Sequence, residues 1–250
     1  MNLYLVFVFL LVCAMAKASE VCPPGHYLVK GHFRTAYARS DGTPVSSTNV
    51  KQHCRKHNEA SEYLIPALAV GAPPNWPHKT EKAGKWIEIE KERLIDAIDS
   101  LPEVLWRKIA IKFYRLLKSK YFPNPATSAE GVLVLYDSAF GGDRDLSRIL
   151  AHELIHEYFR NLSPSEAQSY RRVTGWHLRL ESDRKINWYG RDSGYVEDDG
   201  SNSYEEDFAN NVEYFLFDKE KFQRLTPKAL QWIEKHFGSD FKLKVRRKQK

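Results

Sequence analysis

The sequence predicts an α+β protein that is rich in helix and has few strands. Two observations point to this class: several stretches repeat apolar residues at helical spacing, whereas one short apolar run, residues 131–136 (GVLVLY), is typical of a strand. The 250 residues are 42% hydrophobic and 28% charged, as in ordinary globular proteins, which excludes disordered, collagen-like and multi-span membrane chains. This length allows one good-sized domain, alone or with a small appendage.

The first part of the chain is expected to form that appendage. Residues 19–58 show little apolar periodicity and interleave basic with aromatic side chains. They also carry a turn signal at Asp41-Gly42, which favours a hairpin-like structure. Residues 71–79 (GAPPNWPHK) have the composition of a proline-rich loop.

Two helices are predicted next, over 87–100 and 102–120. Pro102 suits the first position of the second helix, because a helix needs no N–H there. The apolar residues that keep a roughly helical period in this stretch are Leu105, Ile109, Ile111, Phe113 and Leu116.

The second half of the chain is expected to be mostly helical. A polar turn at 138–143 follows the strand at 131–136, and Asp143 is the expected N-cap of the next helix. Residues 174–200 are loop-like, being rich in Gly, Asp, Trp and Tyr. The helices predicted in this half cover about 143–161, 203–217 and 227–237.

The net charge of +6 and the pI near 9.0 raise the question of a nucleic-acid partner. The charge is uneven: residues 241–250 carry six Lys or Arg and no acid, and residues 20–58 have a net charge of +4. Residues 59–240 have a net charge of −5, which disfavours a nucleic-acid-binding core. The basic tail, residues 242–250, is expected to be a solvated terminus or a device that holds anionic polymers or membrane surfaces.

The N-terminus is predicted to be a signal peptide, residues 1–18. Leu3–Ala14 form a 12-residue apolar run, too short for a bilayer of about 30 Å. Small residues at Ala14, Ala16 and Ala18 suit cleavage after Ala16 or Ala18, although no Lys or Arg precedes the run. An uncleaved anchor is the alternative. With cleavage, no transmembrane span remains and a secreted or periplasmic protein is expected.

Cleavage would remove Cys13 and leave Cys22 and Cys54. Two cysteines in an oxidising compartment predict one disulfide, and two unpaired thiols are the alternative. The bridge would close a loop of about 32 residues and contribute on the order of 3–4 kcal/mol by chain entropy.

One motif carries chemistry: His152-Glu153-Leu154-Ile155-His156 is a His-Glu-x-x-His sequence. On a helix, residues four apart project from one face, so both imidazoles can bind one Zn²⁺. Glu153 would then lie beside a zinc-bound water and act as its general base. Chance matches in this composition are expected roughly 0.02 times, and the apolar neighbours Ile149 and Leu150 indicate a core helix.

With this motif the chain resembles the HExxH zinc metallopeptidases, or zincins. The metzincin branch is excluded, because Phe159 and Leu162 stand where that pattern needs Gly and His. The gluzincin branch takes a Glu from a later helix, and residues 206–210 (EDFAN) are similar to its Glu-x-x-Ala pattern. The resemblance thus implies Glu206 as the third zinc ligand. Helical phase with the apolar stripe instead favours Glu205, which stays open as the alternative.

The resemblance also implies a fold and further roles. The expected fold is a small mixed sheet packed on the HExxH helix, with a mostly helical C-terminal half, over a domain of residues 59–241. The strand at 131–136 would provide a sheet edge that pairs with substrate backbone. Tyr204 is the expected oxyanion stabiliser, and Asn210 could support a ligating His. Other candidate donors in the loop are His177, Tyr189, Arg191 and Tyr195.

The sequence therefore predicts a monomeric, exported metallopeptidase with one Zn²⁺ per chain that hydrolyses peptides or proteins. Its basic ends could hold an anionic surface polymer. Two alternatives remain: a zinc hydrolase that acts on a non-peptide amide such as cell-wall material, and a non-catalytic zinc-containing binding protein. The presence of Glu153 argues against the second, because a structural zinc site needs no general base.

Overall fold

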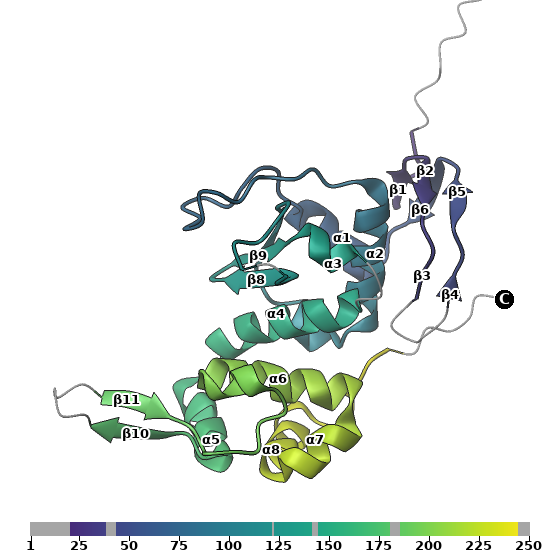
Figure 1. The fold of residues 1–250 in the computed structure, drawn as a ribbon. Coiled ribbons are helices and arrows are strands. Elements are labelled where there is room, and N and C mark those ends of the chain that lie inside the picture. The colour runs from purple at the N-terminus through teal and green to yellow at the C-terminus, as the bar shows by residue number, and fades with distance from the viewer. Residues whose placement is uncertain (1–20, 39–43, 122, 142–144, 181–185, 245–250) are drawn as a thin grey trace, which may run out of the picture.

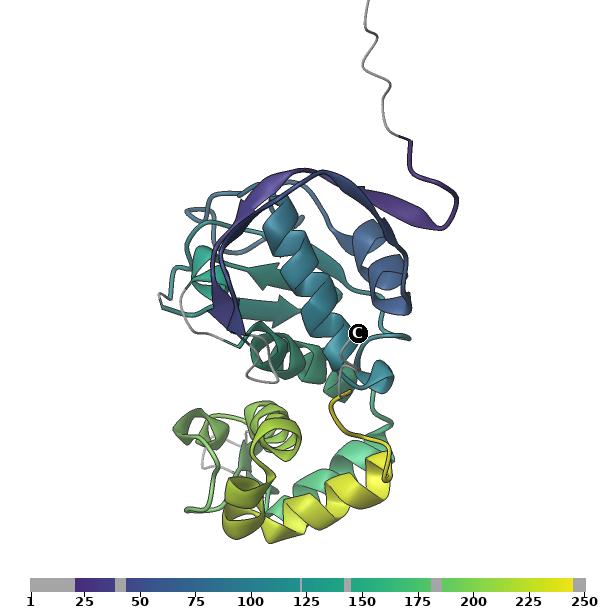
Figure 2. The ribbon, with the colours of Figure 1, turned by 90° about the vertical axis from the view of Figure 1, so that its right-hand side faces the viewer.

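The computed structural model describes residues 21–38, 44–121, 123–141, 145–180 and 186–244 (Figures 1 and 2). It shows the predicted α+β class, with small sheets and mostly helical connections. The proposed signal peptide lies outside the described residues, as do residues 245–250 of the basic tail. In the part of the chain that is described, no helix is both long and apolar enough to cross a membrane.

The N-terminal appendage is a long two-stranded ribbon. Its six short strands form three antiparallel pairs. The first strand along the chain, β1, pairs with the last, β6, and β2 pairs with β5 and β3 with β4. The expected disulfide joins Cys22 to Cys54, and the ribbon arches over the sheet-containing half of the molecule (Figure 2). The strands are β1 (His26–Val29), β2 (His32–Arg34), β3 (Tyr37–Ala38), β4 (Pro44–Val45), β5 (Thr48–Val50) and β6 (His53–Lys56).

A mixed three-stranded sheet forms the centre of the half of the molecule that lies at the top of Figure 1. Its order is β7 (Lys112–Arg115), β9 (Val132–Leu135), β8 (Ala126–Ala129). β7 runs parallel to β9, and β8 runs antiparallel to it. The strand predicted over 131–136 is therefore present, but its expected place at the sheet edge is wrong. Its continuous apolar run suits a central strand covered on both faces, and the more polar β8 is the edge.

Alternation along the strands gives the sheet two apolar faces. Phe113 and Leu133 belong to the main core with the helices, whereas Tyr114 and Val134 form a smaller cluster on the other face. Trp76, from the predicted proline-rich loop, covers this second face. The sheet is thus buried on both sides.

The helix predicted over 102–120 is wrong. This stretch holds a short 3₁₀ turn at Glu103–Leu105 and then β7. Its apolar residues also fit a period of two: Ile109, Ile111 and Phe113 are buried, and the residues between them are exposed. β-branched and aromatic residues at that spacing favour a strand.

Four α-helices lie in the same half of the molecule as the sheet: α1 (Glu59–Leu64), α2 (Glu88–Ser100), α3 (Asp137–Phe140) and α4 (Leu146–Arg160). α4 carries the His-Glu-x-x-His motif. Its N-cap is Asp145, whose side chain accepts hydrogen bonds from the N–H groups of Ser147 and Arg148. Asp143, the expected cap, lies outside the described residues.

The C-terminal half is helical apart from one hairpin in the stretch expected to be a loop. Capping residues set its helix boundaries, Ser163 and Gly175 for α5 and Ser203 for α6. Its elements are α5 (Pro164–Thr174), β10 (His177–Leu180), β11 (Ile186–Tyr189), a 3₁₀ turn at Asp198–Ser201, α6 (Tyr204–Phe217), α7 (Lys219–Leu225) and α8 (Pro227–Phe237).

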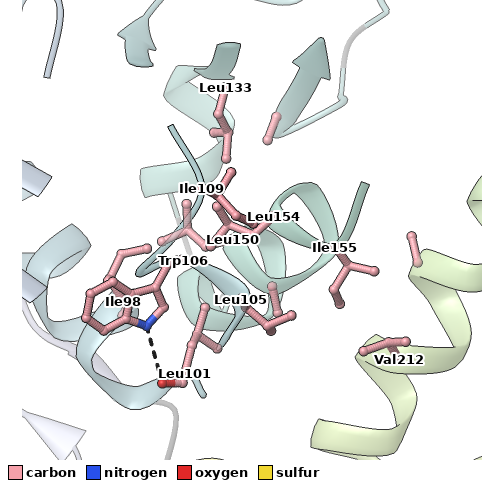
Figure 3. Close-up of a cluster of buried hydrophobic side chains, with 14 of the residues drawn as sticks. Ile98, Leu101, Leu105, Trp106, Ile109, Leu133, Leu150, Leu154, Ile155 and Val212 are labelled. Atoms are coloured by element: carbon pink, nitrogen blue, oxygen red, sulfur yellow. Dashed lines mark hydrogen bonds between the residues drawn. The ribbon is translucent and has the colours of Figure 1, made fainter. Parts of the chain in front are cut away.

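α4 and α6 join the two halves (Figure 1). Ile155 of α4 and Val212 of α6 are fully buried on facing sides of the two helices (Figure 3). On the other side of α4, Leu150 and Leu154 pack in the same core as Leu133 of the sheet (Figure 3). This packing holds one face of α4 against α6, where the polar side chains of the motif lie.

Candidate metal centre

His152 and His156 lie one turn apart on α4, and their Nε2 atoms are 3.2 Å apart. The apolar residues around them, including Leu150, Leu154 and Ile155, are buried in the core. The helix is thereby fixed in rotation, and both imidazoles point to the same side.

Glu206 completes a cluster of three from the first turn of α6. Its Oε2 atom lies 3.4 Å from Nε2 of His152 and 3.4 Å from Nε2 of His156. Ser203 caps this turn by accepting a hydrogen bond from the N–H of Glu206. The potential ligand atoms of the three residues all lie within 4.8 Å of one another. Glu205 lines the adjacent cavity but does not belong to this cluster.

The spacing of the three atoms suits a zinc ion. Bonds of about 2.0–2.1 Å that meet at tetrahedral angles place ligand atoms about 3.3–3.4 Å apart. The observed separations of 3.2, 3.4 and 3.4 Å agree with this geometry. Two imidazoles and one carboxylate also form a zinc ligand set that leaves a fourth position open.

A second carboxylate, that of Glu213, orients His152. Its Oε2 atom lies 3.0 Å from Nδ1 of His152, so the other ring nitrogen of His152 faces the cluster. Arg148 in turn donates a hydrogen bond to Glu213. Such outer hydrogen bonds fix the orientation and tautomer of a ligating imidazole.

The expected supporting role of Asn210 belongs to Glu213 instead. The Asn210 side chain donates to Oδ1 of Asp199 at 2.6 Å and thereby ties α6 to the turn at 198–201. The sequence does hold a signal for Glu213. Glu206, Asn210 and Glu213 have the spacing i, i+4, i+7, which is one stripe along a helix.

The charges in this cluster shift the pKa values of its members. Desolvation disfavours protonated His152, but hydrogen bonds with Glu206 and Glu213 outweigh it and raise the pKa of His152 to about 10. Desolvation also opposes ionised Glu206, yet the two histidines hold its pKa far below the usual range. The pKa of Glu213 is lowered in the same way, against desolvation, by His152 and Arg148. A metal ion bound by Nε2 would displace the proton that His152 shares with Glu206, whereas the proton on Nδ1 would stay hydrogen-bonded to Glu213.

Glu153 follows His152 and projects beside the cluster. It is 9% exposed, and no residue that the structure describes donates a hydrogen bond to its carboxylate. It lines both cavities that meet at the cluster. A buried, ionisable group without a partner is costly, and such groups are typical of functional sites.

The first of the two cavities, here termed the strand cavity, has a volume of about 730 Å³. It runs between the edge strand β8 and the first turn of α6, and its walls include Thr127, Ser128, His156 and Glu206. The second, here termed the acidic cavity, has a volume of about 660 Å³. It lies between the N-terminal half of α4 and the 3₁₀ turn at 198–201. Asn124, His152, Glu153 and Asp199 line both cavities.

Tyr204, the expected oxyanion stabiliser, does not line either cavity. Its ring packs against Phe159, Trp176 and Trp188, and the Arg171 guanidinium lies 4.0 Å from its centroid. Two residues along a helix turn the side chain by about 200°, so Tyr204 and Glu206 point to opposite sides of α6.

The other donor candidates of the loop have structural partners as well. Arg191 forms hydrogen bonds with both carboxylate oxygens of the buried Asp207, and the Tyr195 hydroxyl donates to the carbonyl of Arg191. His177 is exposed and contacts Tyr189 on the β10–β11 hairpin. Polar groups that do line the strand cavity include Tyr121, Arg160 and Asn202, which the sequence did not single out.

The chain matches no protein-family model, and searches of curated proteins and of solved structures find no significant match either. Its function is therefore inferred from the chemistry of the site.

Proposed function

We propose that this protein is an exported zinc-dependent metallopeptidase of the gluzincin-like type. One observation carries the proposal: His152, His156 and Glu206 bring their ligand atoms to tetrahedral spacing beside the unpartnered carboxylate of Glu153. The zinc-ligand set and the base lie where two open cavities meet, so a substrate can reach them.

A zinc ion held by these residues would supply a Lewis acid that polarises the substrate carbonyl and lowers the pKa of water. The remaining work belongs to the chain. Glu153 accepts a proton from the attacking water and passes it to the leaving amine. Its position in α4, next to His152, keeps the carboxylate within the site throughout both transfers.

The edge strand β8 supports a peptide as the substrate. Pro125 accepts a hydrogen bond from the N–H of Tyr136, so alternate residues of β8 point their backbone groups towards β9. The N–H and C=O groups of Ala126 and Ser128 consequently point away from β9. These residues also line the strand cavity, where an extended peptide can add to the sheet.

Export is supported by the disulfide and by the N-terminal sequence. Cys22 and Cys54 are bonded, and disulfides persist in oxidising compartments. The apolar run of residues 3–14 precedes this bridge and has the length of the apolar core of a signal peptide. We propose a secreted or periplasmic location and a monomer as the working state.

Purified mature protein tests the proposal through zinc content and hydrolysis of unfolded casein. We expect about one zinc per chain and proteolysis that a chelator abolishes. The Glu153→Gln variant should keep its zinc but lose at least about a hundredfold of the activity, because Gln cannot accept the proton. Glu62→Gln, on the exposed side of α1, is the charge-matched control and should retain full activity.

Two outcomes would separate the alternatives. Equal activity of wild type and Glu153→Gln would contradict a peptidase mechanism that uses this base. Stoichiometric zinc without hydrolysis of casein, peptides or peptidoglycan would favour a binding protein. Hydrolysis of peptidoglycan alone would favour the non-peptide amide.

A further inference from the structure

We infer that the acidic cavity binds a cationic side chain of the substrate, so that the enzyme prefers peptides with Lys or Arg next to the bond that it cleaves. This inference rests on the proposed peptidase function and specifies its substrate. The cavity opens directly beside the candidate zinc site, because His152 and Glu153 form part of its wall. A residue adjacent to the reacting carbonyl would therefore enter it.

The cavity wall carries more acidic than basic side chains, with six carboxylates against one guanidinium. The wall has one permanent cation, Arg148, which is hydrogen-bonded to Glu213 and lies 4.5 Å from the centroid of the Tyr214 ring. The carboxylates in the wall come from three separate elements: Asp145, Glu153, Glu197, Asp198, Asp199 and Glu213.

Several of these acids are held in place by the fold. Asp145 caps α4, Asp199 accepts from Asn210, and Glu197 accepts hydrogen bonds from Tyr214 and Lys221. Their carboxylates are thus fixed around the cavity before any ligand binds, which reduces the entropy cost of recognition.

Two carboxylates in the wall lack a compensating partner. Glu153 is nine-tenths buried, faces the cavity and receives no hydrogen bond from the described residues. Asp198 forms no side-chain hydrogen bond or ion pair with any residue that the structure describes. Asp198 is exposed at the mouth of the cavity, and a guanidinium or ammonium group can form a charge-assisted hydrogen bond with it that a neutral side chain cannot form. Glu153, which keeps its role as the base, adds negative charge at the end of the cavity next to the candidate zinc site.

The volume also fits a long side chain. At about 660 Å³, the cavity falls within the range of small-molecule binding sites. Apolar contact is available at Pro125 and Ile149, against which the methylene stem of Lys or Arg can pack while its charged end reaches the acids.

Binding of a matched peptide pair tests the inference without relying on turnover. The two peptides are identical and otherwise neutral, except that one carries Arg where the other carries citrulline, which has a similar shape and no charge. With zinc-loaded wild type, and with the cleavable bond of both peptides replaced by a reduced bond that cannot be hydrolysed, we expect the Arg peptide to bind at least about tenfold more tightly at low salt, with the preference falling as salt rises.

Variants localise the effect. Adding Asp145→Asn and Asp198→Asn to that protein should reduce the preference to below about threefold, and Asn keeps the helix cap at position 145. Adding Glu62→Gln, which also removes acidic charge but lies on α1, should leave the preference unchanged. Zinc content and circular dichroism verify that each variant is folded.

Equal affinity for the two peptides, or no measurable binding of either, would overturn the inference. A preference that survives the double Asn substitution would do so as well. The cleavage sites of wild type in unfolded casein give an independent measure, and we expect Lys or Arg beside most of them. Cleavage of casein without a preference for Lys or Arg would contradict the inferred specificity but not the peptidase function. Absence of cleavage would contradict the peptidase function, and the comparison of the Arg and citrulline peptides would then decide whether the acidic cavity binds a cation.

Discussion

Oε2 of Glu213 lies 3.0 Å from Nδ1 of His152, while Nε2 of the same ring lies 3.4 Å from Glu206. Both carboxylates come from α6, two helical turns apart. One helix thus contributes both a candidate zinc ligand and the group that orients a second ligand. This arrangement couples the packing of α6 on α4 to the geometry of the candidate metal centre.

The first prediction concerns this orienting contact. Glu213→Gln should weaken zinc binding by about 10–100-fold, because His152 loses the charged acceptor that fixes its tautomer and ring direction. Competition with a chromophoric chelator measures the affinity. Glu220→Gln, an exposed acid of α7, is the control and should bind zinc as wild type does. Unchanged affinity in Glu213→Gln would show that the contact contributes nothing to the metal site.

The third ligand gives the second prediction. Glu206→Ala should reduce the zinc content from about one per chain to well below half, because two imidazoles alone hold the ion weakly. Glu205→Ala should retain about one zinc, since Glu205 lines the strand cavity outside the ligand cluster. Metal analysis after dialysis compares the two. The reverse result would identify Glu205 as the ligand.

The sequence could predict much of this site because its elements are local. The residues His152, Glu153 and His156 fall within one helix, so their shared face follows from helical spacing alone. The choice between Glu205 and Glu206 could not be derived in this way. Residues Asp207–Phe215 of α6 are all buried, so its apolar stripe does not reveal which side faces α4.

The incorrect predictions also have physical causes. The apolar residues of 109–113 fit periods of both two and three to four, and pairing with β9 selects the strand. Helical spacing places Glu213 on the same stripe of α6 as Glu206, but its contact with His152 and the shape of the acidic cavity depend on contacts between α4, α6 and the turn at 198–201. Such contacts arise from tertiary packing, which no local pattern encodes.

The third prediction concerns Asp207, which is 1% exposed and receives hydrogen bonds from Arg191, Trp176 and Asn211. Asp207→Asn should lower the free energy of unfolding by about 3 kcal/mol, because the change leaves the Arg191 charge without its counter-ion in a largely buried setting. Urea denaturation of the metal-free proteins measures this. The exposed Asp240→Asn should be within about 0.5 kcal/mol of wild type. A similarly small effect at Asp207 would contradict its structural role.

The fourth prediction is that the contribution of Glu81 to the free energy of unfolding depends on pH. Glu81 is hydrogen-bonded to Trp76 and Tyr136, which belong to the smaller apolar cluster of the sheet. Desolvation opposes its ionised form, but hydrogen bonds from the Lys120 N–H, the Trp76 indole and the Tyr136 hydroxyl outweigh this and lower its pKa below 4.5. A carboxyl whose pKa is lower in the folded state stabilises the protein above its unfolded pKa. This stabilisation is lost as the pH falls through the folded value. In metal-free protein, the difference in unfolding free energy between wild type and Glu81→Gln should therefore be largest near neutral pH and shrink below about pH 4.5. Glu220→Gln, at an exposed position without hydrogen bonds of this kind, should show no such trend. A difference that stays constant from neutral to acid pH would mean that the ionised form of Glu81 is not what the three donors stabilise.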